Sequence, residues 1–113
     1  MDAVVRVHRA LGPGLLESVY ETCLAHELRK RGLQVRTQIS VPVVYDGERL
    51  EAGLRLDLVV DDNVIVEVKA VEKMNPVCEA QLLTYLKLTG LRLGLLVNFN
   101  VPLAKDGIKR LVR

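Results

Sequence analysis

The 113-residue sequence has little of several residue types that mark particular classes of protein. Its two cysteines, Cys23 and Cys78, lie far apart and form no CxxC pair, so we expect reduced, packed thiols and a cytoplasmic protein rather than a disulfide framework. Its two histidines, His8 and His26, have no neighbouring cysteine or histidine at zinc-ligand spacing. A structural zinc site is therefore not expected.

Long hydrophobic runs and a strong charge of one sign are also missing. No apolar run approaches the roughly 18 residues of a membrane span, and Arg6, His8 and Arg9 interrupt the N-terminal apolar stretch, which argues against a signal peptide. The net charge of +2 permits nucleic-acid binding but does not indicate a dedicated binder. The hydrophobic fraction of 50% and charged fraction of 27% are ordinary for a folded protein, and the length predicts one domain over residues 1–113.

The most informative stretch covers residues 54–71, where two alternating segments flank a polar break at residues 61–63. Alternation, β-branched residues and the break predict two antiparallel strands joined by a tight turn. Side chains of successive strand residues point to opposite faces of a sheet. One face of this hairpin is therefore expected to be aliphatic throughout, and it would be formed by Leu54, Leu56, Leu58, Val60, Val64, Val66, Val68 and Ala70.

The opposite face of the hairpin carries Asp57, Glu67 and Lys69. If residues 61–63 form a three-residue loop, Asp57 lies across from Glu67 at one cross-strand spacing, roughly 5 Å. One interpretation is a solvated surface pair of little energetic weight. The other starts from the poor strand propensity of aspartate and from the repulsion between facing carboxylates, which a cation or a proton relieves. Carboxylates suit Mg²⁺ or Mn²⁺, and the nearby lysine would face charge developing on a phosphate.

Helical periodicity predicts helices over residues 1–11 and 15–31, separated by the Gly12-Pro13-Gly14 break. Glu17 falls at the start of the second helix. An acid is favourable there because of the helix dipole; alternatively, Glu17 is a third carboxylate brought to the polar face of the hairpin. Asn75-Pro76 begins a third helix, which Gly90 ends. We expect its apolar side to be Val77, Leu82, Leu83, Leu86 and Leu88, with Gln81 and Tyr85 on a different stripe.

Further strands are predicted on both sides of the hairpin. The segment 35–44 alternates, and Pro42 within it suits an edge strand or a bulge. Its expected single face is Val35, Thr37, Ile39, Val41 and Val43. Asp46-Gly47 is a turn signal before the strand that starts near Leu50. The apolar segment 91–99 follows a strand–helix crossover, so we expect it to lie parallel to the 64–71 strand. Residues 105–113 fit either a helix or a short edge strand.

Several of these residues, in this order, resemble a known family. They are Gly14-x-x-Glu17-x-x-Tyr20, Asp57, Glu67-x-Lys69, Gln81-x-x-x-Tyr85 and Asn98-Phe99. The set resembles the GxxExxY family of the PD-(D/E)XK nuclease-like superfamily over about residues 8–110. The resemblance implies a mixed α/β (α+β) fold with a restriction-endonuclease-like αβββαβ core. That core has a three-stranded antiparallel meander, a crossover helix and a parallel strand, which is the order that the sequence patterns also predict. Leu56 stands where many superfamily members have a proline.

The same resemblance implies roles for individual residues. Asp57 and Glu67 would bind Mg²⁺ or Mn²⁺ together with the backbone carbonyl of Val68. Lys69 would orient or activate the attacking water, and Glu17 would lie beside the metal directly or through water. The two residues that would border the site and contact the DNA backbone are Gln81 and Tyr85.

Two functional hypotheses follow from the sequence. The first is a metal-dependent nuclease that hydrolyses phosphodiester bonds in DNA. The second is a non-catalytic module of nuclease fold that binds nucleic acid or protein, which the small size, the modest charge and the lack of a targeting domain favour. A homodimer is expected in either case to hide apolar surface, because half of the residues are hydrophobic.

Overall fold

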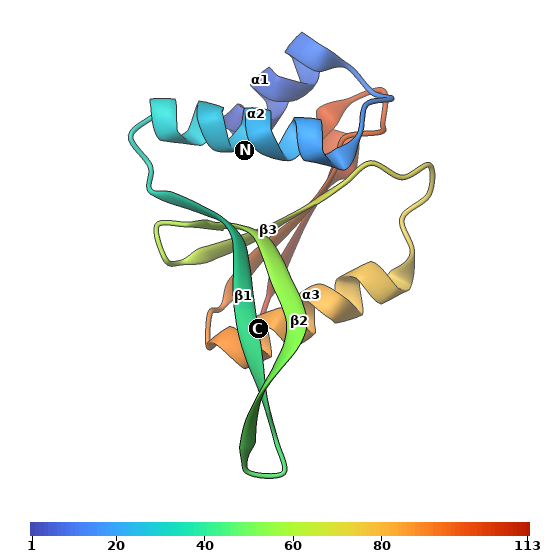
Figure 1. The fold of residues 1–113 in the computed structure, drawn as a ribbon. Coiled ribbons are helices and arrows are strands. Elements are labelled where there is room, and N and C mark those ends of the chain that lie inside the picture. The colour runs from blue at the N-terminus through green and yellow to red at the C-terminus, as the bar shows by residue number, and fades with distance from the viewer.

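A five-stranded mixed sheet lies between two layers of helices in the computed structural model, which describes residues 1–51 and 53–113 (Figure 1). Along the chain the elements are α1 (Asp2–Leu11), α2 (Glu17–Lys30), β1 (Val35–Tyr45), β2 (Glu48–Val60), β3 (Val64–Lys69), α3 (Pro76–Thr89), β4 (Leu93–Asn98), the short 3-10 helix η1 (Ala104–Gly107) and β5 (Ile108–Val112). The strand order is β1-β2-β3-β4-β5. Strands β3 and β4 are parallel and the other neighbours antiparallel.

The predicted αβββαβ order is confirmed, with α1 added before it and β5 after it. The C-terminal segment, for which helix and strand both remained open, therefore ends as an edge strand paired with β4. None of the helices in the described part of the chain is long and apolar enough to cross a membrane.

Local sequence signals set the ends of the elements as expected. Val60 pairs with Val64, which makes residues 61–63 the three-residue loop of the β2–β3 hairpin. Asn75 caps α3 by accepting a hydrogen bond from the backbone N–H of Val77, at 2.9 Å, and Gly90 ends the helix in the left-handed conformation at φ 77°. The register of β1 against β2 shifts around Pro42, which is the predicted bulge in an edge strand.

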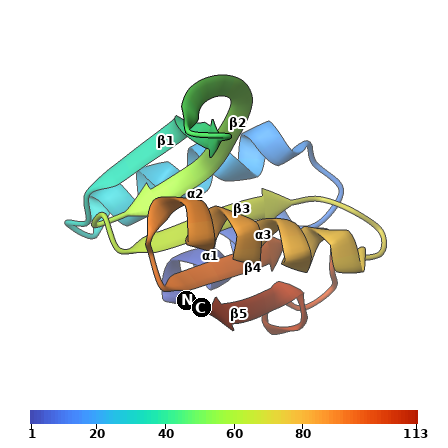
Figure 2. The ribbon, with the colours of Figure 1, turned by 90° about the horizontal axis from the view of Figure 1, so that it is seen from below.

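Two hydrophobic clusters form the core, one on each face of the sheet. Helices α1 and α2 cover the first cluster, which includes Val4, Tyr20, Leu24, Leu58, Val66, Val97 and Phe99. Helix α3 covers the second, which includes Leu56, Val59, Ile65, Leu82, Tyr85, Leu86 and Leu96. Figure 2 shows α3 lying across the sheet with β4 and β5 at its side. The face of the hairpin opposite the aliphatic one also carries Val59 and Ile65, and it is not a solvated surface, because both of these residues are buried under α3.

The strand faces predicted from simple alternation are right for β3, where Val64, Val66, Val68 and Ala70 lie at the first cluster, but wrong for part of β2. Leu58 and Val60 belong to the first cluster, whereas Leu54 and Leu56 pack against the second. Strand β1 behaves in the same way, with Val35 in the first cluster and Ile39 and Val41 at the second. The apolar side chains of β1 therefore switch from the first cluster to the second between Val35 and Ile39, and those of β2 switch from the second to the first between Leu56 and Leu58.

The reason for this inversion lies at Gln38, whose φ of 50° is unusual for a residue other than glycine. The pairs on either side of it are Thr37 with Leu58 and Ile39 with Leu56, so the break falls level with Asp57. A period-two pattern does not reveal the break, because aliphatic residues occupy both sides of it. The irregular backbone at Gln38 therefore lies next to Asp57, the acid that the sequence indicated as a candidate site residue.

The predicted apolar side of α3 is only partly right. Leu82 and Leu86 are fully buried, and Tyr85 joins them in the second cluster. Val77, Leu83 and Leu88, in contrast, are exposed on the outer side of the helix. Because α3 is rich in apolar residues all round, its sequence does not distinguish the buried stripe from the exposed one.

Candidate functional site

The side chains of Asp57 and Glu67 each accept a hydrogen bond from the backbone of the neighbouring strand, where the β2–β3 ladder ends. The last backbone pair before them is Leu58 with Val66. Beyond it, the backbone N–H of Val68 donates to Asp57 Oδ2 at 2.8 Å, and the backbone N–H of Asp57 donates to Glu67 Oε1 at 3.2 Å. The two carboxylates thus take the place of main-chain carbonyls across the hairpin, which places them side by side as the predicted register requires.

Burial and repulsion act together on Glu67, whose side chain is only 5% exposed. Desolvation raises the pKa of Glu67 from 4.5 to about 8, and the negative charge of Asp57 adds to this rise. The neighbouring ammonium group of Lys69 has the opposite effect and lowers it. At neutral pH the carboxyl group of Glu67 is therefore largely protonated, so that a bound cation would be expected to displace its proton.

Lys69 and Tyr85 complete the immediate surroundings of this pair. Lys69 ends β3 two residues after Glu67 and is half-buried. Tyr85 lies near the pair on α3, the helix that covers the second cluster. Burial raises the pKa of Tyr85, and so do the charges of Glu67 and Asp57. The phenol therefore stays protonated and is available as a hydrogen-bond donor. Gln81 lies one helical turn before Tyr85 and is exposed to solvent.

Glu17 is brought to the same end of β3 from the other helical layer. Its Oε1 accepts a hydrogen bond from the backbone N–H of Ala70 at 3.4 Å, directly after Lys69. Glu17 is the first residue of α2, so its position depends on the loop that enters the helix. The sequence hypothesis of a third carboxylate at the hairpin matches this placement.

Tyr20 fixes the loop before Glu17. Its buried hydroxyl donates to the carbonyl oxygen of Gly12 at 2.5 Å and accepts from the backbone N–H of Leu15 at 3.1 Å. Its ring stacks on Phe99, with ring centroids 4.5 Å apart and planes 4° apart. Tyr20 therefore holds the glycine-containing loop of residues 12–16 in place. The position of this loop in turn determines where Glu17 begins α2.

Asn98, in the Asn98-Phe99 motif, likewise fixes the backbone beside the site through hydrogen bonds. This buried side chain donates to the carbonyl oxygen of Val71 at 2.9 Å and accepts from the backbone N–H groups of Val71 and Asn100, both at 3.1 Å. The Asn98 side chain therefore links the segment that follows β3 to the end of β4 by hydrogen bonds, close to Lys69. Asn98 and Phe99 act as structural residues that hold the site, rather than as members of it.

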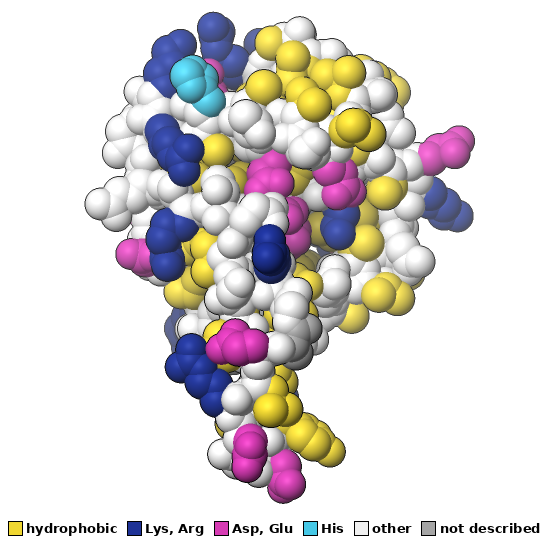
Figure 3. Space-filling model, viewed as in Figure 1, with side chains coloured by type: hydrophobic (Ala, Val, Ile, Leu, Met, Phe, Trp, Pro, Cys, Tyr) yellow, Lys and Arg dark blue, Asp and Glu magenta, His cyan; other side chains and the backbone are white. Residues whose placement is uncertain are grey.

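Glu21 and Gln38 are neighbours of the site that sequence reasoning missed. Glu21 lies one turn after Glu17 on α2, and burial, Asp57 and Glu17 all raise its pKa. Gln38 donates to Glu21 Oε1 at 2.7 Å from the irregular point of β1. The four-residue spacing from Glu17 could have identified Glu21, whereas no pattern in the sequence indicates Gln38. Figure 3 shows the acidic side chains gathered in the middle of this face, with hydrophobic side chains above them.

The donor set fits a small, hard divalent cation. One oxygen of each carboxylate accepts a main-chain N–H, which leaves the other oxygen of Asp57 and of Glu67 for a ligand. Within residues 1–51 and 53–113 no three His, Cys, Asp or Glu side chains are close enough together to hold a metal. The chain thus offers two carboxylates, the number that Mg²⁺ commonly takes from a protein beside waters and substrate phosphate.

Comparison with known proteins agrees with this geometry. The profile of the PD-(D/E)XK nuclease superfamily matches residues 1–111, nearly the whole chain. No curated protein and no solved structure matches the chain.

Proposed function

Because this chain belongs to the PD-(D/E)XK nuclease superfamily, we propose that it is a nuclease that hydrolyses phosphodiester bonds in DNA with the help of Mg²⁺ or Mn²⁺. The observation that carries the proposal is the reciprocal contact between Asp57 and Glu67 beside Lys69. Two neighbouring carboxylates, one of them buried, form an arrangement that a divalent cation stabilises.

In this proposal each side chain has a separate task. Asp57 and Glu67 would hold the cation through their remaining oxygens, together with the carbonyl oxygen of Val68. The cation, when bound, would supply charge for the scissile phosphate and lower the pKa of a bound water. Lys69 orients the attacking water and stabilises negative charge on the phosphate. Glu17 holds a water at the edge of the site from the start of α2.

The DNA backbone would pass along α3. Tyr85 donates a hydrogen bond to a phosphate oxygen near the buried pair, and Gln81 contacts the next part of the strand from the exposed side of the helix. Support comes from the burial of Tyr85 beside Glu67 and from the exposure of Gln81 one turn away. We further propose that the chain is a member of the GxxExxY family, on the basis of Gly14, Glu17 and Tyr20.

Cleavage of supercoiled plasmid by the purified chain tests this proposal. Nicking is expected with Mn²⁺ or Mg²⁺ and not with EDTA, and both Asp57→Asn and Lys69→Ala should abolish it. Arg49→Ala is the matched control, because Arg49 is exposed on the β1–β2 hairpin and not on α3. Nicking that persists in the Asp57 and Lys69 variants would reveal a contaminant and refute the assignment.

The alternative function, a nuclease-fold module that binds without cleaving, is favoured by one observation. A Glu67 pKa of about 8 leaves this carboxyl largely protonated at neutral pH and weakens its hold on a cation. Calorimetric titration with Mn²⁺ separates the two functions. Binding of an ion that Asp57→Asn removes supports the nuclease, whereas DNA association without ion binding supports the module.

We also propose that the chain forms a homodimer through the β1–β2 hairpin. Strand β1 is an edge of the sheet, and the hairpin extends away from the body of the molecule (Figure 1). Near its tip, Val44 and Tyr45 are about 70% exposed, and Leu50 is exposed beside them. An isolated two-stranded ribbon is only marginally stable in water, so that a second copy covering this ribbon would stabilise it.

A further inference from the structure

A groove of about 610 Å³ lies between α1 and the end of α2, away from the acidic site. Its charged lining is dominated by Arg6, Arg9 and Arg31, with Asp2 as the acid among the lining residues. Figure 3 shows Lys and Arg side chains gathered over the C-terminal end of α2, whereas several acidic side chains lie near the middle of the view. Glu17 and Glu21 lie in the N-terminal half of α2, whereas Arg29 and Lys30 lie in its last turn.

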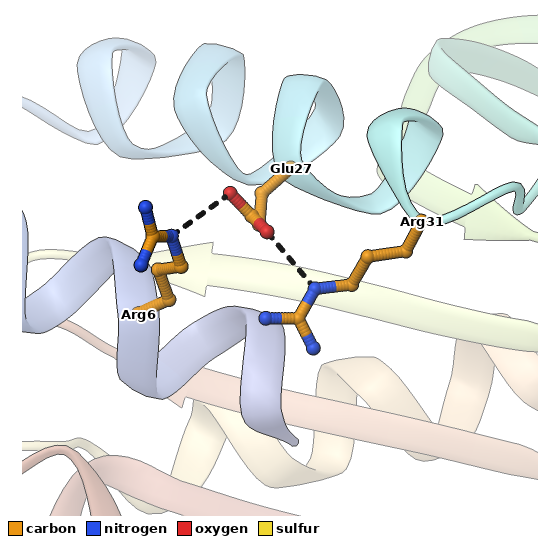
Figure 4. Close-up of polar contacts among 3 residues, drawn as sticks. All are labelled: Arg6, Glu27 and Arg31. Carbon is orange, nitrogen blue, oxygen red and sulfur yellow. Dashed lines mark hydrogen bonds and ion pairs between the residues drawn. The ribbon is translucent and has the colours of Figure 1, made fainter.

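Glu27 contacts two of the three arginines of this groove, Arg6 and Arg31. Its side chain, 12% exposed, lies between Arg31 Nε at 2.9 Å and Arg6 Nε at 3.6 Å. The hydrogen bond from Arg31 holds the pKa of Glu27 below its usual range, so that the carboxylate stays charged. In both arginines it is Nε that faces Glu27, and Figure 4 shows the terminal guanidinium nitrogens pointing away from the carboxylate.

This arrangement leaves the donors that bind phosphate free. The terminal nitrogens of a guanidinium form parallel hydrogen bonds to two phosphate oxygens. Because Glu27 restrains two of the arginines, less side-chain freedom is lost when a phosphate binds. Arg9 lines the same groove and is exposed. The two carboxylates of Glu27 and Asp2 do not neutralise three guanidinium groups, so the groove keeps an attraction for anions.

We propose that this groove binds backbone phosphates of the same nucleic-acid strand whose scissile phosphate lies at Asp57 and Glu67. The inference rests on the proposed function, from which it takes nucleic acid as the ligand and Asp57 and Glu67 as the place of the scissile phosphate. Glu17 and Arg31 lie at opposite ends of α2, about 20 Å apart at 1.5 Å per residue. At about 3.4 Å per nucleotide of a stacked strand, the groove engages phosphates about six nucleotides from the site of cleavage.

Fluorescence anisotropy with a labelled 20-nucleotide strand in EDTA tests the groove without any cleavage. The test variant is Arg6→Gln/Arg9→Gln, which leaves the Glu27–Arg31 pair intact. Arg49→Gln is the matched control, since Arg49 is an exposed arginine at the hairpin, 71% exposed. Two lost phosphate contacts should make the negative slope of log K against log salt less steep by about 1.4 for a single strand. The control should keep the slope of the unmodified protein.

Three further measurements decide between outcomes. A 4-nucleotide strand should bind the unmodified protein much more weakly than the 20-nucleotide strand does, because it cannot reach the groove and the acidic site at once. Equal affinity and slope for the 20-nucleotide strand in both proteins would overturn the proposal, as would displacement of the strand by inorganic phosphate at a similar concentration, which would indicate a small-anion site. If the unmodified chain binds DNA through the groove but never cleaves it, the nuclease function fails and the groove stands.

Discussion

Replacing Glu67 with glutamine tests the electrostatic account of the buried pair. Glutamine has the size of glutamate and can still accept the N–H of Asp57. The folded-state pKa of Glu67, about 8, lies above the ordinary 4.5, so folding favours the protonated form. Its contribution to stability is therefore complete below about pH 4.5 and is lost as the pH rises toward 8.

The shift sets the size of the effect. A rise from 4.5 to about 8 corresponds to a few kcal/mol, and no more than about 5, of stability lost on ionisation. We expect the metal-free protein to become less stable toward urea between pH 5 and pH 8.5. The Glu67→Gln variant should lack that part of the decline and be the more stable protein at pH 8.5, by on the order of 2–5 kcal/mol.

Chemical denaturation in EDTA at several pH values measures this difference. Glu51→Gln is a suitable control, because Glu51 is an exposed acid of the β1–β2 hairpin. The control should follow the unmodified protein at every pH. If the free energy of unfolding of Glu67→Gln ran parallel to that of the unmodified protein from pH 5 to pH 8.5, Glu67 would ionise normally and the reasoning would be refuted.

Three more outcomes follow from the same geometry. Calorimetry should find Mn²⁺ affinity rising about tenfold per pH unit between pH 5.5 and 7.5, because the ion displaces the proton of Glu67; affinity independent of pH would contradict this. Tyr20→Phe should lower the free energy of unfolding by about 1–3 kcal/mol through lost hydrogen bonds, and should slow DNA cleavage more than it weakens Mn²⁺ binding; unchanged cleavage would mean that the loop needs no anchor. Tyr45→Glu should convert a dimer to a monomer in light scattering, and an unmodified protein that is monomeric at high concentration would refute the interface.

Much of the fold follows from local signals in the sequence. Asn75-Pro76 and Gly90 give both ends of α3, and the three-residue loop after Val60 sets the register of the β2–β3 hairpin. These signals work because each depends on a few neighbouring residues. The register in turn predicts that Asp57 and Glu67 lie side by side, as their hydrogen bonds show.

What the sequence does not predict depends on the tertiary structure. The reversal of faces at Gln38 comes from one unusual backbone angle in a strand whose residues are aliphatic on both sides. The part played by Glu21 depends on how α2 lies over β1, and the choice of Leu82 and Leu86 over Leu83 and Leu88 depends on how α3 meets the sheet. Alternation and helical period carry no information on such packing.

The proposed function requires that Asp57 and Glu67 hold one divalent cation between them. Anomalous diffraction from crystals soaked in Mn²⁺ at pH 8 tests it most directly. We predict a single anomalous peak within about 2.0–2.5 Å of an oxygen of each carboxylate, which Glu67→Gln removes. A map without a peak there, in a crystal whose carboxylates lie as described, would contradict the account.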